Sequence, residues 1–240
     1  MPDSIEGWQK PQKILVMLAH PDDPEFFCGA TIARWVRLGH SVKYCLLTKG
    51  DKGSQDRTVK PEELAQIRVE EEYRASAVLG VNSVRFLDYC DGTLFSSMET
   101  RRTVARVIRQ EKPDVLVTCD PTNYYPREGT INHPDHRTAG QIVLDGYFPA
   151  AGNPMFFPEL LDEGLEPHSV KELWLSLPCE ANLILDVTEY WDLKIKALHE
   201  HHSQIPSMEA LDKRMLNRFA PDSTLASPRY EEKFRRIVFT

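Results

Sequence analysis

The sequence has no apolar run that approaches the length of a membrane-spanning segment. Such a segment needs ~20 predominantly apolar residues, and the longest runs here fall far short of that. The first 13 residues, MPDSIEGWQKPQK, also lack the apolar stretch of a signal peptide. Five cysteines, an odd number without a paired spacing, predict reduced and mostly buried thiols rather than a disulfide framework. We therefore expect a cytoplasmic protein with no membrane span.

Basic residues form no dense stripe, and the chain carries a net charge of −7 at pH 7. This balance argues against a nucleic-acid partner, because surfaces that bind a phosphate backbone gather lysine and arginine on one face. Small molecules or proteins remain as partners, and the composition leaves open whether the chain forms a homo-oligomer. Several common motifs are also missing: G-x-G-x-x-G after a strand, G-x-x-x-x-G-K-[ST], G-x-S-x-G and H-E-x-x-H.

The 240 residues, 41% of them hydrophobic, are enough to bury a sizeable core in one large α/β domain or two small ones. No internal repeat, low-complexity tract or linker divides the chain, so we expect a single domain over residues 1–240. The proline-rich stretch 149–167 is interpreted as a long loop rather than a domain boundary.

Aliphatic and β-branched runs alternate with helical patterns along the chain. Strands are predicted at 14–19, 42–48, 84–88, 115–119, 173–177 and 183–187, and helices at 29–38, 62–79, 99–111, 137–143 and 189–202. In the second of these helices, Pro61 suits the first turn and Gly80 the position just after the end. The segment YEEKFRRIVF predicts a short helix running into a last strand. The alternation indicates a Rossmann-like three-layer α/β fold, with a mostly parallel central sheet and helices on both faces.

Two His-Pro-Asp tripeptides contain the candidate chemistry. His20 directly follows the first predicted strand in AHPDDPEF, and His133 lies in NHPDHR after the fourth. Ligands gather beyond the carboxyl ends of parallel strands, so both clusters are expected to face one crevice. A single His-Pro-Asp is more often a capped turn, because aspartate caps helices and proline favours their first position. Two such clusters at one edge favour a metal site.

The spacing suits a catalytic zinc site, which needs three protein ligands and one open position. A turn begun at Pro21 aims His20 and Asp23 at one point, and His136 completes the set. Asp22 is then placed to accept a proton from water whose pKa the metal lowers. Two further roles are predicted in the second cluster: His133 holds a proton near the developing oxyanion, and Asp135 orients an imidazole from behind.

A family resemblance rests on several segments of the chain. The stretch AHPDDPEFFCGATIARW, followed by LLTKGDKGS, IRVEEEYRASAVLGV, FLDYCDG, NHPDHRTAG and KALHEHHSQ, resembles the LmbE/PIG-L family of metal-dependent N-acetylglucosaminyl deacetylases. The resemblance covers nearly the whole chain. It implies zinc ligands at His20, Asp23 and His136. It also implies a base at Asp22 and an oxyanion or acid role for His133.

The resemblance also suggests that Arg68 reaches toward the substrate, although an ion pair with neighbouring glutamates on a helix surface is an equal alternative. Loop residues Tyr124, Tyr125 and Asn132 are candidate sugar-binding groups. Phe27 and Ala30 stand where family members often have glycine, so the shape of the pocket and the size of the substrate stay open.

Two further groups receive no role in the chemistry. Glu25 is interpreted as a charge favoured by the helix N-terminus. The histidines in HEHHSQ, residues 199–204, are interpreted as surface or packing groups on a helix.

The predicted activity is that of a zinc-dependent hydrolase that removes the N-acetyl group from an N-acetylglucosamine-type sugar or glycoside. Another divalent metal such as Fe²⁺ is compatible with the same ligands. The alternatives are hydrolysis of another small amide or an ester, or a nonenzymatic Rossmann-like binding protein whose clusters are only turns.

Overall fold

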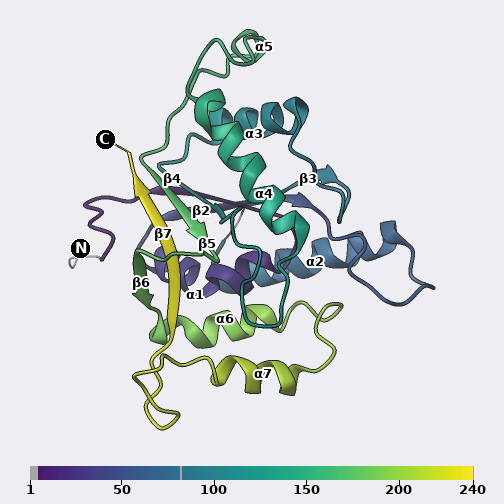
Figure 1. The fold of residues 1–240 in the computed structure, drawn as a ribbon, viewed down its shortest axis with the longest axis vertical. Helices are drawn as coiled ribbons and strands as arrows, with labels where there is room; N and C mark the ends of the chain where they lie inside the picture. The colour runs from purple at the N-terminus through teal and green to yellow at the C-terminus, as the bar shows by residue number, and fades with distance from the viewer. Residues whose placement is uncertain (1–4, 82, 240) are drawn as a thin grey trace.

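The computed structural model describes residues 5–81 and 83–239. The first four residues, part of the N-terminal stretch expected to lack a signal peptide, lie outside the described residues. One seven-stranded sheet forms the centre, in the order β3-β2-β1-β4-β5-β7-β6 (Figure 1). Its strands are β1 (Lys13–Leu18), β2 (Ser41–Thr48), β3 (Val84–Tyr89), β4 (Val115–Cys119), β5 (Glu172–Ser176), β6 (Leu183–Asp186) and β7 (Glu231–Val238).

The sheet is mostly parallel, as predicted. Strands β3, β2, β1, β4 and β5 pair in parallel, and β7 runs antiparallel to both of its neighbours, β5 and β6. All six predicted strands are present within one or two residues of their expected ends. The predicted last strand is β7. The short helix expected before it is wrong, because the segment that starts at Glu231 is strand throughout.

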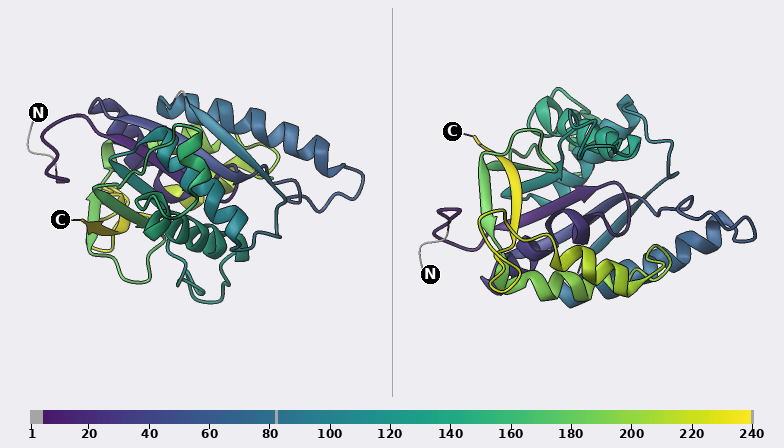
Figure 2. Two further views of the ribbon diagram at one scale, coloured as in Figure 1. Left: turned by 90° about the horizontal axis from the view of Figure 1, so that it is seen from above. Right: turned by 60° about the horizontal axis from the view of Figure 1, so that its bottom comes forward.

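Helices cover both faces of the sheet, which confirms the three-layer arrangement (Figures 1 and 2). On one face lie α1 (Asp23–Arg37), α2 (Pro61–Leu79), α6 (Trp191–Leu198) and α7 (Met208–Leu216); on the other lie α3 (Met98–Glu111) and α4 (Pro134–Asp145). Alternate residues of β1 point into two separate cores: Ile14, Val16 and Leu18 into one, Leu15 and Met17 into the other. This alternation follows from the period of two along a strand.

Helix α1 starts six residues before its predicted beginning at residue 29. Its backbone leaves helical geometry at Cys28, with φ −148° and ψ 21°, so the helix has two parts. The carboxylate of Glu232 on β7 accepts hydrogen bonds from the N–H groups of Ala30 and Thr31, at 3.3 and 2.7 Å, at the start of the second part. Lys194 of α6 lies 2.5 Å from the same carboxylate. The prediction found the second part and missed the first turn, which Pro24 initiates.

The region after β6 differs most from the predictions. The helix predicted at 189–202 is shorter: a 3-10 turn, η2 (Thr188–Tyr190), leads into α6, which ends at Leu198. The residues that follow, including His201, are therefore in a turn rather than on a helix. Helix α7 was not predicted. Its start is capped by the hydroxyl of Ser207, which accepts from the N–H of Ala210 at 3.2 Å.

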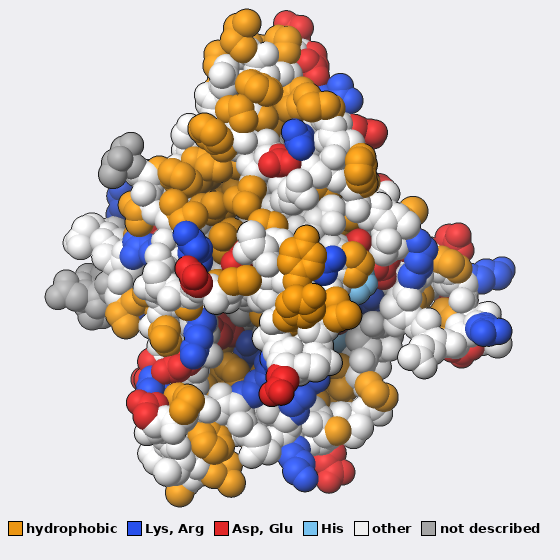
Figure 3. Space-filling view, in the orientation of Figure 1, with side chains coloured by type: hydrophobic (Ala, Val, Ile, Leu, Met, Phe, Trp, Pro, Cys, Tyr) orange, Lys and Arg blue, Asp and Glu red, His pale blue; other side chains and the backbone are white. Residues whose placement is uncertain are grey.

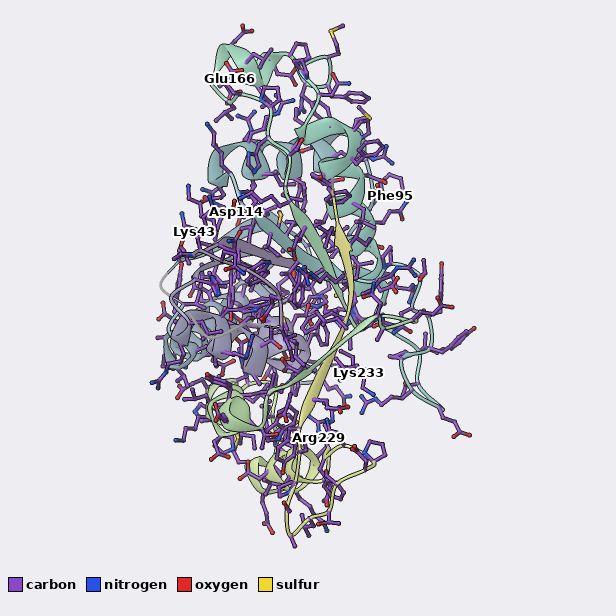
Figure 4. All side chains as sticks on the ribbon, turned by 90° about the vertical axis from the view of Figure 1, so that its left-hand side faces the viewer. Lys43, Phe95, Asp114, Glu166, Arg229 and Lys233 are labelled. Carbon is purple, nitrogen blue, oxygen red and sulfur yellow. The ribbon has the colours of Figure 1, made fainter. Side chains whose placement is uncertain are left out.

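A long irregular segment follows α4, as the proline-rich stretch predicted, with a π-helical turn, η1 (Gly146–Ala151), and the short helix α5 (Glu159–Asp162). Figure 4 shows Glu166 at the end of the molecule that this segment forms. The guanidinium of Arg109, fully buried on α3, donates to backbone carbonyls of the segment at Ala150, Ala151, Asn153, Phe156 and Leu165. One side chain thus anchors the whole segment.

The two edges of the sheet differ in character. At the amino ends of β1 and β4, Asp114 accepts from the backbone N–H of Lys13 at 2.9 Å, an ordinary structural contact. Figure 4 shows Asp114 on the opposite side of the molecule from Phe95, which follows β3. Both His-Pro-Asp clusters lie at the carboxyl edge. No helix within residues 5–81 or 83–239 is long and apolar enough to span a bilayer.

Candidate active site

The turn after β1 fixes Asp23 between the backbone and an imidazole. Asp23 Oδ2 accepts hydrogen bonds from the N–H groups of Ala19 and His20, at 3.1 and 2.8 Å. Its other oxygen, Oδ1, lies 3.0 Å from His136 Nε2. The carboxylate is almost completely buried. One oxygen is therefore held by the chain, and the other points to the second cluster.

His136 lies in the first turn of α4, and Asn132 sets its tautomer. His136 Nδ1 lies 2.9 Å from Asn132 Oδ1, while Asn132 Nδ2 donates to the carbonyl of Asn123 at 2.8 Å. That second bond fixes the amide orientation, so Nδ1 of His136 is the donor and Nε2 keeps its lone pair. The Asn132 side chain is buried and both of its amide atoms make these contacts, while its role as a substrate contact stays a prediction.

His20 lies between Asp23 and two further carboxylates. Its Nδ1 is 3.5 Å from Asp23 Oδ2, and its Nε2 is 3.1 Å from Asp91 Oδ1 and 3.4 Å from Asp135 Oδ2. The structure thus places Asp135 behind an imidazole, where the sequence predicts it. Asp91 has no role among the sequence-based predictions. The available signal was its position in an Asp-Gly pair just after β3, at the same sheet edge.

The charges around His20 are strongly unbalanced. Burial opposes a charge on His20, but hydrogen bonds to Asp135, Asp23 and Asp91 outweigh it and raise the pKa of His20 well above its usual value. Although burial raises the pKa of Asp91, His20 brings it down to about 2. Asp23 titrates well below its ordinary pKa: burial opposes this, and the two imidazoles outweigh burial. A centre so rich in carboxylates favours an additional cation.

The donor set fits a divalent metal. Ligand nitrogens of His20, His133 and His136 lie within 4.8 Å of one another, and Asp23 contacts the first and last of these rings. Nε2 of His136 and Oδ1 of Asp23 face each other at 3.0 Å. Nitrogen and carboxylate oxygen in a three-ligand set are the donors that catalytic zinc takes in proteins.

His133 caps the start of α4 through its ring. Its Nδ1 accepts a hydrogen bond from the N–H of Asp135 at 3.2 Å, so this nitrogen carries no proton and the hydrogen is on Nε2. Partial burial and the rings of His20 and His136 lower the pKa of His133. The structure therefore favours a neutral ring that donates from Nε2, whereas the sequence led us to expect a ring that holds an extra proton.

Asp22 has an unusual backbone and a perturbed carboxyl group. Its φ of 88° lies in the left-handed region, which is uncommon for a residue with a side chain. Burial raises the pKa of Asp22 to about 6. The guanidinium of Arg68 lies 3.5 Å from Asp22 Oδ2 and partly opposes this increase, whereas the negative charge of Asp23 adds to it. A carboxyl group near this value ionises close to neutral pH, which suits a general base.

Arg68 is buried, so the alternative of a surface ion pair with neighbouring glutamates is wrong. Its guanidinium donates to the carbonyls of Pro21, at 2.7 Å, and Gly50, at 3.0 Å. A Cβ atom added at Gly50 or Gly53 would approach Arg68 Nη1 to 2.2 or 2.4 Å. Glycine at these two positions of LLTKGDKGS therefore makes room for the arginine.

These groups line a pocket of about 290 Å³. Figure 3 shows histidine surface at the bottom of a hollow near the middle of the molecule. The ring of Phe27 forms part of the wall, with its centroid 5.1 Å from that of His136. Tyr124 and Tyr125 are exposed and do not line this pocket; the guanidinium of Arg137 lies 4.3 Å from the Tyr124 ring centroid. The lining residues are His20, Asp22, Asp23, Phe26, Phe27, Gly53, Arg68, Asp91, His133, His136 and Gln204.

Two larger hollows, of about 480 and 690 Å³, lie beside the edge strand β3. Their described lining residues include no histidine, so they offer no comparable combination of imidazoles and carboxylates.

His201 and Glu25 form a second buried group behind the site. His201 Nε2 lies 3.3 Å from Glu25 Oε2, both side chains are fully buried, and Glu72 lies beside them. The prediction of His201 as a surface or packing histidine on a helix missed this polar contact. Glu25 likewise does more than favour a helix terminus. Glu25, Glu72 and His201 lie far apart in the sequence, so the spacing of residues gave no signal that they meet.

Comparison with known proteins identifies the family. The sequence pattern of the family described as "PIG-L: GlcNAc-PI de-N-acetylase" matches residues 15–147, more than half of the chain. A diacetylchitobiose deacetylase from Thermococcus kodakarensis is 36% identical over 201 residues, which cover 84% of this chain and 73% of that protein. The chain belongs to the PIG-L family, which the sequence segments indicated.

One solved structure agrees with this assignment, and a second shares the fold. The N,N'-diacetylchitobiose deacetylase from Pyrococcus horikoshii, complexed with its inhibitor MPG, has a TM-score of 0.84 and 32% identity; the match covers 94% of this chain and 84% of that one. The 4-carboxy-2-hydroxymuconate hydratase GalB from Pseudomonas putida has a TM-score of 0.76 at 20% identity, with 95% and 97% covered. This second likeness concerns the fold alone, which hosts more than one activity.

Proposed function

We propose that this chain is a metal-dependent N-deacetylase that hydrolyses the acetamide of an N-acetylglucosamine-type sugar or glycoside, releasing acetate and a free amine. The observation that carries the proposal is the convergence of His20, Asp23 and His136 beside Asp22 and His133 in one pocket. The relatives named as deacetylases of acetylated sugars support the choice of bond and substrate.

Three side chains are proposed to hold the metal: His20 through Nδ1, Asp23 through Oδ1 and His136 through Nε2. Zinc suits the two imidazoles and one carboxylate, and Fe²⁺ is compatible with the same donors. When bound, the cation supplies polarisation of the acetyl carbonyl and a lowered pKa of a water molecule. Asn132 and Asp135 are not proposed as ligands. Asn132 contacts and orients the imidazole of His136, and Asp135 contacts and orients that of His20.

Asp22 is proposed as the general base. Its carboxylate lies next to the proposed ligand Asp23 and lines the pocket, so it can remove a proton from water as that water attacks the carbonyl carbon. The same group, now protonated, returns the proton to the leaving nitrogen when the C–N bond breaks. One carboxyl thus moves the proton from water to amine, and the products are acetate and the free amine.

His133 is proposed to stabilise the oxyanion as a neutral hydrogen-bond donor. The amide N–H of Asp135 occupies Nδ1, so Nε2–H is the donor left for the substrate. A neutral donor aimed at the oxygen on which charge develops stabilises the transition state more than the ground state.

We assign recognition of the sugar to side chains in the wall of the pocket. Arg68 and Asp91 offer charged groups to hydroxyls, and Phe27 narrows the space beside His136. We propose that this narrowing makes the enzyme discriminate among glycosides by the size of the group attached to the amino sugar. Replacing Phe27 with glycine is expected to change that preference while metal content stays the same.

The experiment measures acetate and free amine after incubation of zinc-loaded protein with N-acetylglucosamine, its short oligomers and simple glycosides. Release is expected from at least one of these, to be lost after chelation and to return with added zinc. No release from any sugar, together with cleavage of a non-sugar amide or ester, would overturn the amino-sugar assignment and leave a metal hydrolase. No metal binding at all would favour a nonenzymatic protein.

Two adjacent aspartates provide a matched pair for the roles of base and ligand. Asp22→Asn is expected to keep one metal per chain while kcat falls by ~100-fold to 10,000-fold, as is typical when a general base is removed. Asp23→Ala is expected to lose the metal as well. Metal analysis and acetate release on both variants separate the two roles, and a fully active Asp22→Asn enzyme would falsify the assignment of the base.

A further inference from the structure

The peptide group between Pro21 and Asp22 is held at both of its polar ends by one helix. The carbonyl oxygen of Pro21 accepts from Arg68 Nη2 at 2.7 Å, and the N–H of Asp22 donates to Glu72 Oε2 at 2.9 Å. Arg68 and Glu72 lie four residues apart on α2, so they share one face of the helix. Because a peptide group is planar, two bonds at its opposite ends fix the rotation of the plane.

That rotation determines where the proposed base points. The peptide plane sets φ of Asp22, which is 88° and therefore in a region that a residue with a side chain adopts only when its surroundings require it. In this conformation the carboxylate lies 3.5 Å from Arg68 Nη2 and lines the pocket. A rotated plane would relax φ and move the carboxylate away from the other catalytic groups.

The burial of Glu72 is otherwise unexplained. Its side chain is fully buried, close to a second fully buried carboxylate, Glu25. The imidazole of His201 pairs with Glu25, and Glu72 Oε1 has no hydrogen-bond partner among residues 5–81 and 83–239. A buried carboxylate with so little compensation destabilises a fold, so an apolar side chain would serve packing better. The hydrogen bond that Glu72 accepts from the Asp22 N–H offers a reason for this buried carboxylate.

We propose that Glu72 is a positioning residue for the reaction: together with Arg68 it orients the Pro21–Asp22 peptide, and catalysis requires a hydrogen-bond acceptor at position 72. This inference rests on the proposed function, in which Asp22 is the general base. It assigns a role to a residue that touches neither metal nor substrate and acts only through the backbone of its neighbour.

The test compares variants that keep or remove the acceptor. Glu72→Gln keeps an oxygen for the Asp22 N–H and is expected to retain kcat within about threefold. Glu72→Leu removes the acceptor, and kcat is expected to fall about 100-fold, the loss that follows a displacement of about 1 Å at a catalytic group. KM for the sugar and one metal per chain are expected to be unchanged in both variants.

A distant buried carboxylate supplies the control. Glu172 on β5 accepts hydrogen bonds from Trp8, Trp174 and Arg236 and is nearly as buried as Glu72. Glu172→Leu is expected to lower the melting temperature and leave kcat at 25 °C unchanged.

If Glu72→Leu does not fold, Glu72→Ala, which leaves space for water, takes its place. Full kcat in the variant without the acceptor, or a loss in Glu72→Gln as large as in Glu72→Leu, overturns the proposal. Loss of the metal from Glu72→Leu also overturns it.

A second readout does not depend on catalysis. Hydrogen exchange at the Asp22 amide is expected to be slow in the parent protein and in Glu72→Gln, and at least 100-fold faster in Glu72→Leu, with the control Glu172→Leu like the parent. If the chain proves not to deacetylate any sugar, this exchange pattern still decides whether Glu72 holds the peptide. Equal protection in all four proteins would show that it does not.

Discussion

At the scale of single residues, Asn132 illustrates how one side chain can orient a proposed metal ligand, His136. Its Oδ1 holds Nδ1 of His136 at 2.9 Å and leaves Nε2 free. Removing such a partner typically weakens metal binding by about 10–100-fold, because the ring and its tautomer are no longer fixed.

We predict that Asn132→Leu raises the zinc dissociation constant by that factor, and that His136→Ala, which removes the ligand itself, raises it further. Competition with a chromophoric chelator measures both values. Unchanged affinity in His136→Ala would mean that this residue is not a ligand, and equal affinity in Asn132→Leu and the parent would remove the orienting role.

The pKa of Asp22 leads to a prediction about pH. Burial raises the pKa of this carboxyl to about 6 in the metal-free protein, and a neighbouring divalent cation favours the ionised form and lowers it again. A base works only when it is deprotonated, so kcat/KM is expected to rise with pH and to level off above an apparent pKa at or below about 6. Profiles of acetate release between pH 4 and 8 measure this limb. A limb centred above pH 7 would indicate that a different group is the base.

At the scale of helices and strands, Arg109 and the segment after α4 form one unit. The buried guanidinium of Arg109 donates to five backbone carbonyls of the segment, so Arg109→Leu leaves those carbonyls without this partner. Such a loss is expected to destabilise the fold by about 2–5 kcal/mol and to lower the melting temperature by about 5–15 °C. Calorimetry measures the shift. Because the segment lies away from the pocket, zinc stoichiometry and kcat at 25 °C are expected to stay the same, and a large change in either would contradict this separation.

The predictions for individual elements succeeded where one local signal determined the outcome. Helix α2 begins at Pro61 and ends before Gly80, whose φ is 82°, as its sequence indicated. The first turn of α1 was missed although Pro24 offered a local signal for it. The backbone break at Cys28 was not predicted, because it lies beside a contact between Ala30 and Glu232, 202 residues apart in the chain. No pattern in a local window contains that information.

At the scale of the whole molecule, the sheet topology explains why the site could largely be predicted. The rule that ligands gather at the carboxyl ends of parallel strands brought His20 and His136 together, and the structure places them there. The contacts of Asn132, Asp91 and His201 were not predicted, since they join side chains across several loops. Topology thus predicts where a site lies, whereas the contacts between side chains within the site become visible only in the three-dimensional structure.

A metal that binds the folded chain and not the unfolded one should stabilise the entire molecule. At a free zinc concentration 1,000 times the dissociation constant, the gain is about 4 kcal/mol, which corresponds to a rise in melting temperature of about 10 °C. We predict this rise for the parent protein and little or none for His136→Ala. Thermal unfolding with and without zinc provides the measurement, and an equal rise in both proteins would place the stabilising metal elsewhere.

The contact between β7 and α1 also has a consequence for the order of events during synthesis. The His-Pro-Asp-Asp turn is translated about 200 residues before Glu232, the acceptor for the N–H groups at the break in α1. Contacts between such distant positions close late, because the chain entropy of a long loop opposes them. A growing chain that has not yet reached β7 therefore presents its proposed metal ligands without the strand that contacts the neighbouring helix α1, and we expect the centre to be completed only after β7 has paired.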